Sequence, residues 1–163
     1  MTECNKIIHK VAMEMLKPVG FVQLGSSRFY AKDYGYFLIL VTYVPMNSVE
    51  GSYIDVFISY YFDYGYDEVF LFNDYHLSFL DEELNKCFSI YNKNEPKKFE
   101  NEIKNFTEIA LKAIVIYCKF EKMEYALEKY KSYSEPTLFW YYYKYGLLLL
   151  LFVHYDEGIE NLK

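Results

Sequence analysis

The sequence predicts a single α+β domain, residues 1–163, with an N-terminal helix, an antiparallel β-meander and C-terminal helices packed on the sheet. Three observations predict this class. Apolar residues at helical spacing open the chain, period-two alternation with β-branched and aromatic residues marks its middle, and helical spacing returns near its end. We place the sheet-rich part at residues 20–75 and the helical part at 97–163. With 163 residues, 53% of them hydrophobic, the chain can bury a core of its own.

The first helix is expected at about residues 3–17, where apolar residues recur every three or four positions. These residues are Ile7, Ile8, Val11, Ala12, Met15 and Leu16. Pro18 and Gly20 follow at once, and they end the helix.

A β-hairpin is expected next, with its turn at Asp33-Tyr34-Gly35. Residues 28–32 lead into this turn, and residues 36–44 follow it as a nearly continuous β-branched and aromatic run. Pro45 to Ser52 is expected to be a loop.

The next strand covers residues 53–62, and its side chains alternate between two faces. The face expected to meet the core carries Ile54, Val56, Ile58, Tyr60 and Phe62. The face expected to meet solvent or a partner carries Tyr53, Asp55, Phe57, Ser59 and Tyr61.

Beyond this strand, residues 69–72 are a candidate edge strand and residues 78–84 a candidate start of a helix. After a break at residues 92–96, a long helix is expected because apolar residues form one stripe. The stripe consists of Phe99, Ile103, Phe106, Ala110, Ile114 and Tyr117. A shorter helix at about 121–130 follows, and a third begins near Glu135-Pro136, where Pro is permitted in the first turn.

The apolar segment 138–155 is expected to be a buried helix and not a membrane span. Lys144 interrupts it, and its strictly apolar part, residues 146–153, is too short to cross a bilayer. Residues 1–10 lack the basic start and apolar block of an export signal. Three widely spaced cysteines, Cys4, Cys87 and Cys118, indicate free thiols and a cytoplasmic location.

The catalytic signatures of common enzyme classes do not occur in the sequence. It has no phosphate-binding glycine loop, nucleophile elbow, zinc-protease motif or EF-hand loop. The three histidines, His9, His76 and His154, are isolated from one another. We therefore predict no catalytic residue, no metal site and no cofactor, and favour a protein that is not an enzyme.

The charge distribution is strongly uneven. Residues 33–85 contain no lysine or arginine and carry a net charge of −10, against −6 for the whole chain. Their ten acids are Asp33, Glu50, Asp55, Asp63, Asp67, Glu68, Asp74, Asp81, Glu82 and Glu83. If these acids share one surface, it attracts a basic protein and repels nucleic acid and anionic membranes.

Tyrosines interleave with the acids in this block, and Tyr is enriched at protein interfaces. The candidate partner-binding residues are Asp55, Asp63, Tyr64, Tyr66, Asp67, Glu68, Asp74 and Tyr75. Two alternatives stay open for the block: an ordinary solvated acidic face, and a divalent-cation site built from some of its carboxylates.

Part of the chain resembles a known bacterial family. The step Leu16-Lys17-Pro18-Val19-Gly20-Phe21, the segment Ser27-Arg28-Phe29-Tyr30 and the strands at 37–43 and 54–62 are similar to the start of domain-of-unknown-function family 4304. The resemblance covers about residues 5–65. It implies an α+β fold with a meander flanked by helices, and it brings no catalytic residues.

The favoured function is a non-enzymatic protein-binding domain with an acidic, tyrosine-rich surface. By analogy, it resembles immunity-type inhibitors that cover the basic site of a toxin. One alternative is an enzyme or metal-binding protein that uses carboxylates such as Asp74 near His76. Another is a helical interaction module that uses the C-terminal helices.

Overall fold

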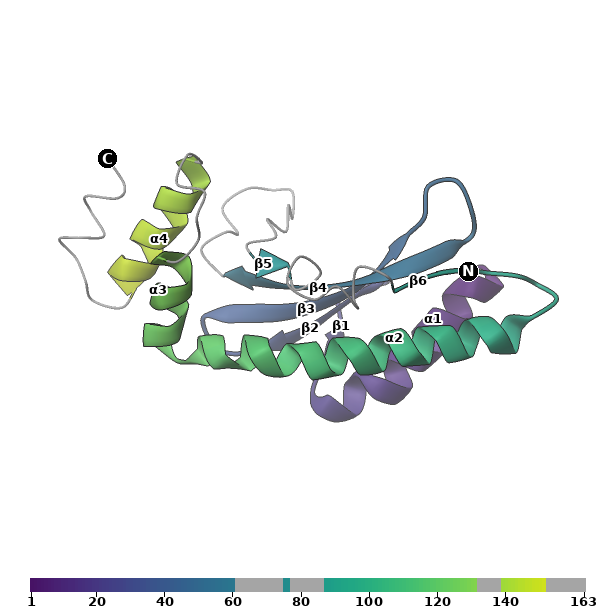
Figure 1. Ribbon diagram of the computed structural model, residues 1–163. Helices are drawn as coiled ribbons and strands as arrows, with labels where there is room; N and C mark the ends of the chain where they lie inside the picture. Colours follow the sequence, from purple (N-terminus) through teal and green to yellow (C-terminus); the bar gives the residue numbers. More distant parts are fainter. Residues whose placement is uncertain (61–74, 77–86, 132–138, 152–163) are drawn as a thin grey trace. The chain divides into compact units, whose positions relative to one another are not determined.

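The structure is a computed structural model and describes residues 1–60, 75–76, 87–131 and 139–151 (Figure 1). The chain divides into two compact units, residues 1–115 and 116–163, and each is described by itself. The helix at the start, the antiparallel sheet and the helices after it confirm the predicted α+β class.

Within the described residues, six antiparallel strands form one sheet in the first unit. They are β1 (Val22–Gln23), β2 (Phe29–Asp33), β3 (Phe37–Pro45), β4 (Gly51–Tyr60), β5 (Tyr75–His76) and β6 (Phe88–Ile90). Strands β1 to β4 lie side by side in chain order. The second side of β4 is shared, because β5 pairs with Phe57 and Ile58 while β6 pairs with residues 51–53.

Helix α1 (Glu3–Met15) confirms the first predicted helix. The Thr2 hydroxyl caps its start by accepting a hydrogen bond from the Asn5 amide at 3.3 Å. A 3₁₀ turn, η1 (Lys17–Val19), follows, and Gly20 ends it at φ +93°, a conformation that favours glycine.

The predicted hairpin is present, with β2 paired to β3 from Phe29↔Thr42 to Asp33↔Leu38. The turn is closed by local hydrogen bonds. The Gly35 amide donates to the Asp33 carboxylate at 2.7 Å, and the Tyr34 amide donates to the Phe37 carbonyl at 3.0 Å. The turn chemistry seen in the sequence therefore sets the register of the hairpin.

Helices α1 and α2 (Pro96–Tyr117) lie on the same face of the sheet (Figure 1). We call this the inner face. Its core residues on β3 and β4 are Phe37, Ile39, Val41, Tyr43, Ile54, Val56 and Ile58, and all are buried. Every residue of the apolar stripe predicted for the long helix is buried as well. The periodicity thus identified both sides of this core correctly.

The opposite face, the outer face, differs from the prediction for β4. Tyr53 is exposed and Asp55 half-buried, but Phe57 is 2% exposed and Ser59 1% exposed. Phe57 forms a buried apolar cluster with Ala31 and Leu40 of the neighbouring strands. The expectation that Phe57 and Ser59 face solvent or a partner was wrong, because alternation says which side chains share a face and not what covers it. Tyr61 and Phe62 lie outside the described residues.

Some predicted boundaries fall outside the described residues. These are the candidate strand at 69–72, the candidate helix at 78–84 and the helix start near Glu135-Pro136. The break at 92–96 is confirmed by the loop before α2. Strand β6 was not predicted, since three residues are too few for a periodic signal.

The second unit contains the end of α2, the 3₁₀ turn η5 (Cys118–Glu121), α3 (Met123–Lys131) and α4 (Phe139–Leu151). Helix α3 confirms the short helix predicted at 121–130. Phe120 is buried between two aromatic neighbours, with ring centroids 6.0 Å from Tyr117 and 5.2 Å from Tyr125. Helices α3 and α4 contact each other, and α4 buries Leu148 and Leu149.

Across the described part of the chain, no helix combines the length and the apolar character that crossing a bilayer requires.

Candidate functional site

The structure describes two of the eight candidate partner-binding residues. Asp55 lies half-buried on the outer face of β4, opposite Thr42 of β3. Tyr75 belongs to β5 and pairs with Ile58. The other six lie outside the described residues: Asp63, Tyr64, Tyr66, Asp67, Glu68 and Asp74. The surface predicted from them stays a prediction.

Three members of the acidic block can be placed, and they do not cluster. Asp33 is the last residue of β2 and pairs with Leu38 of β3. Leu38 in turn pairs with Ser59 of β4, so Asp33 lies at the same height in the sheet as Ser59. Glu50 precedes Gly51, at the other end of β4. Position 50 is nine residues from position 59, so at ~3.4 Å per residue the two acids are on the order of 31 Å apart along the strand direction. Any common acidic surface therefore needs the block's remaining carboxylates, which lie outside the described residues.

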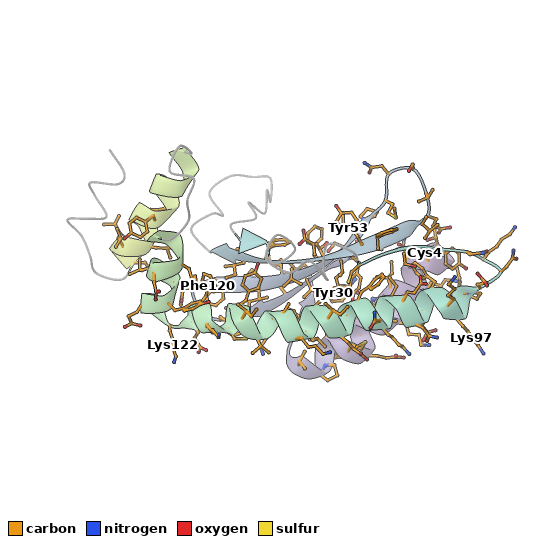
Figure 2. All side chains as sticks on the ribbon, in the orientation of Figure 1. Cys4, Tyr30, Tyr53, Lys97, Phe120 and Lys122 are labelled. Carbon is orange, nitrogen blue, oxygen red and sulfur yellow. The ribbon has the colours of Figure 1, made fainter. Side chains whose placement is uncertain are left out.

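A different feature is exposed on the outer face, where β6 pairs with the start of β4. Phe88 is 58% exposed, Ile90 54% and Tyr53 43%. Tyr53 and Phe88 are direct cross-strand partners, and Ile90 is the partner of Gly51. We call these three side chains the outer patch. Figure 2 shows Tyr53 on this face and Tyr30 on the opposite, helix-covered face.

Strand β6 has two chemically different faces. Ser89, between Phe88 and Ile90, is buried, and its hydroxyl donates a hydrogen bond to the Glu102 carboxylate of α2. This contact ties β6 to α2 on the inner face, so the two large apolar side chains must point outward.

Gly51 brings β6 close to β4. A Cβ atom at this position would overlap the Ser89 carbonyl oxygen and lie 3.1 Å from the Ile90 Cα. Only glycine leaves room for this approach. The position of β6, and with it the outer patch, therefore depends on Gly51. No feature of the sequence alone indicates this role.

The second edge of β6 has no strand beside it among the described residues. The Ile54 amide donates to the Cys87 carbonyl at 3.2 Å, and the Tyr91 amide donates to the Glu50 carbonyl at 2.7 Å. Backbone groups alternate in direction along an antiparallel strand, so those of Ser89 also face β4. The N–H and C=O groups of Phe88 and Ile90 consequently point away from β4. We call this side the free edge.

A groove of about 370 Å³ runs along the free edge to the first turns of α2. Residues of β6, of the loop after it and of the start of α2 line it: Phe88, Ser89, Ile90, Asn92, Glu95, Lys98, Phe99 and Glu102. Lys97 lies on the side of α2 that is turned away from the sheet (Figure 2). The groove thus combines apolar residues with two acidic residues and one basic residue.

Two acids and one arginine shape the electrostatic environment at this end of the sheet. The pKa of the Tyr91 hydroxyl is raised by partial removal from water, and further by the negative charges of Glu3 and Glu50. Arg28, the lone arginine, lies on the inner face and donates to the Asn5 side-chain oxygen from Nε at 2.8 Å. Its guanidinium also donates to the Gly51 carbonyl at 3.4 Å, so this cation lies beside the strand position that pairs with Ile90.

The histidine and cysteine residues with reactive side chains are mostly structural where the chain is described. His9 lies 3.3 Å from the Tyr30 hydroxyl, between α1 and β2. Cys4, Cys87 and Cys118 form no disulfide bond, and burial raises the pKa of Cys4, which makes it a poor nucleophile. In the described ranges no three His, Cys, Asp or Glu side chains are placed to hold a metal ion.

The alternative site near His76 stays a prediction. His76 belongs to β5 and pairs with Phe57, but Asp74 lies outside the described residues.

Sequence reasoning anticipated part of the outer patch. It placed Tyr53 and Asp55 on the outward face of their strand, and the structure confirms this for both. It missed Phe88, Ile90 and the groove. The available signal was the sequence Phe-Ser-Ile, two large apolar residues that alternate with a small polar one.

Comparisons with protein-family models, with curated proteins and with solved structures found no match for this chain. The resemblance to family 4304 accordingly stays a prediction.

Proposed function

We propose that this chain is a protein-binding domain and that the outer patch of Tyr53, Phe88 and Ile90 is the centre of its docking surface. One observation supports this most directly. Three large apolar side chains, each more than 40% exposed, occupy adjacent positions at one end of a sheet face whose other end is buried. Contiguous exposed apolar surface of this kind marks interaction sites, and aromatic residues are enriched at the centres of interfaces.

The charge pattern supports a basic partner. Asp55 lies on the outer face two residues beyond Tyr53 on β4, and Glu50 is exposed and directly precedes Gly51, which pairs with Ile90. No lysine or arginine occurs between residues 33 and 85. A basic partner would be steered toward this end of the sheet, and its association rate would fall with rising salt. An inhibitor of the immunity type, which covers the basic site of a toxin, fits this chemistry by analogy.

The test starts with affinity capture from the source cells and is decided by kinetics with the purified partner. The variant Tyr53→Ser/Phe88→Ser removes two of the three apolar side chains of the patch. We expect its dissociation rate to rise at least about tenfold, because central aromatic residues contribute much of the energy of an interface. We also expect association of the unmodified chain to slow between 50 and 300 mM salt.

Val22→Ser is the matched control, since Val22 is 64% exposed on the opposite edge strand β1. Its kinetics should equal those of the unmodified chain. Equal rates for the double variant and this control would show that the outer patch is not the docking surface.

A further inference from the structure

Resting on the proposed function, we infer that the partner docks by adding an extended strand to the free edge of β6, and that this strand alternates apolar and basic residues. Strand addition to a sheet edge is a recurrent mode of protein recognition, in which main-chain hydrogen bonds supply affinity and alternate side chains supply specificity. The two faces of β6 define that alternation.

The backbone of β6 offers the hydrogen-bonding groups that such a strand needs. The N–H and C=O groups of Phe88 and Ile90 point away from β4, and no described strand pairs with them. Proteins commonly protect an edge with Lys, Pro or another charged residue on it. The sequence of β6, Phe-Ser-Ile, contains none of these.

The side chains of an added strand would meet two different environments. Those on the outer face would lie beside Phe88 and Ile90, whose exposed surface favours apolar partners. Those on the inner side would enter the groove between β6 and α2, beside Ser89 and Phe99. Its volume of about 370 Å³ lies within the range of binding pockets, roughly 300–1,000 Å³.

Charge complementarity selects basic side chains for the groove. Its lining residues include two acids, Glu95 and Glu102, and one basic residue, Lys98. The carboxylate of Glu102 is already fixed by the Ser89 hydroxyl and needs little reorganisation to accept a further donor. At the end of β6, removal from water raises the pKa of Tyr91 most, and the negative charges of Glu3 and Glu50 raise it further. An acidic strand would instead meet like charges.

The probe is a capped peptide of eight residues that alternates valine and lysine, with a valine–glutamate peptide as its counterpart. Binding to the full chain is measured by fluorescence anisotropy, and backbone amides are followed by NMR. We expect the lysine peptide to bind at least tenfold more tightly than the glutamate peptide. We also expect the amide hydrogens of Phe88 and Ile90 to gain protection from exchange on binding.

The protein variant Ile90→Pro removes one N–H group from the free edge and leaves the hydrogen bonds to β4 in place. We expect it to bind the lysine peptide at least tenfold more weakly, while Ile90→Val, which keeps the N–H group, stays within twofold. Glu102→Gln should reduce the discrimination between the two peptides at least threefold.

A second test leaves the protein unchanged and so does not depend on the folding of the proline variant. Two further lysine peptides are used, one N-methylated at every valine and the other at every lysine. In one of the two, the methylated amides are those that face the free edge, so this peptide cannot donate hydrogen bonds to it. We expect this peptide to lose at least tenfold in affinity. Equal affinity of both methylated peptides, or of both charge types, would overturn the inference. The inference would also be overturned if analytical ultracentrifugation showed a dimer that Ile90→Pro abolishes. The edge would then pair with a second copy of the chain.

These outcomes separate the inference from the proposed function. If the captured partner binds Ile90→Pro with unchanged rates but loses affinity for Tyr53→Ser/Phe88→Ser, strand addition is wrong and the docking surface stands. If the lysine peptide binds at the edge but the double variant keeps its partner, the edge is a binding site and the proposed docking surface is wrong.

Discussion

At the scale of single residues, a buried hydrogen-bond relay joins the sheet to α2. The Tyr43 hydroxyl lies 2.7 Å from Thr107 Oγ1, and both side chains are buried. Thr107 donates its own hydrogen to the Ile103 carbonyl at 2.7 Å, so Tyr43 must be the donor in the contact between the two. Burial raises the pKa of Tyr43 well above its usual range, which keeps this donor protonated.

Thr107→Val should destabilise the protein by about 1–3 kcal/mol, because the Tyr43 hydroxyl would remain buried without an acceptor. Urea denaturation at pH 7 measures the free energy of unfolding. The double variant Tyr43→Phe/Thr107→Val removes donor and acceptor together, so it should recover most of that loss. A double variant as unstable as the sum of the single variants would show that the two hydroxyls do not interact.

At the scale of elements, charged side chains hold α1 against α2. Glu100 accepts from Lys10 Nζ at 2.8 Å and from Lys104 Nζ at 3.0 Å, and Lys104 also reaches Glu14 at 3.5 Å. Hydrogen bonds from Lys10 and then Lys104 lower the pKa of Glu100 below its usual value. Since the folded-state pKa is the lower one, this contribution to stability is present above about pH 4.5 and is lost as the pH falls through the folded-state value.

Glu100→Gln should therefore lower the free energy of unfolding at pH 7 by less than about 1 kcal/mol, since the network is solvent-exposed. The difference should shrink in 0.5 M salt and vanish once the pH is below the lowered pKa of Glu100, where both chains carry a neutral side chain at this position. Thermal or urea unfolding across this pH range measures it.

Glu108→Gln, an exposed glutamate on the same helix, is the control and should leave stability unchanged. A loss for Glu100→Gln that does not diminish as the pH falls below the usual range of a glutamate would show that packing, and not charge, is responsible.

At the scale of the whole molecule, the chain forms two compact units, and the sheet with its two covering helices belongs to the first. The inner-face core is built from α1, the sheet and the apolar stripe of α2, most of which precedes residue 116. A unit with its own core can fold independently of its neighbour.

A chain that ends at residue 121 should thus keep a cooperative urea transition and a near-UV circular dichroism signal. Its m-value should be smaller than that of the full chain, because less surface is exposed on unfolding. A chain that ends at residue 95 lacks α2, leaves the inner face uncovered, and should not fold. Loss of the cooperative transition in the longer fragment would contradict the independence of the first unit.

The spacing of apolar residues predicted helices and strands well wherever it repeated over several turns of helix or several residues of strand. The apolar spacing of α1 and α2 and the Asp-Tyr-Gly turn between β2 and β3 all recur in the structure within a few residues of their expected bounds. Each of these signals depends on neighbours in the chain, so helix and strand periodicity carry it directly. The free thiols and the inward face of β4 were likewise predictable.

The sequence by itself determined the α+β class, the inner-face core and the uneven distribution of charge. Only the tertiary structure decided that Phe57 is buried while Phe88 is exposed, and that Ser89 and Glu102 come together beside a free edge. Strand β6 pairs with β4 although 27 residues of chain, 61–87, separate the two strands. Pairing between such distant segments depends on which surfaces remain uncovered once the local elements have packed, and no local period encodes that.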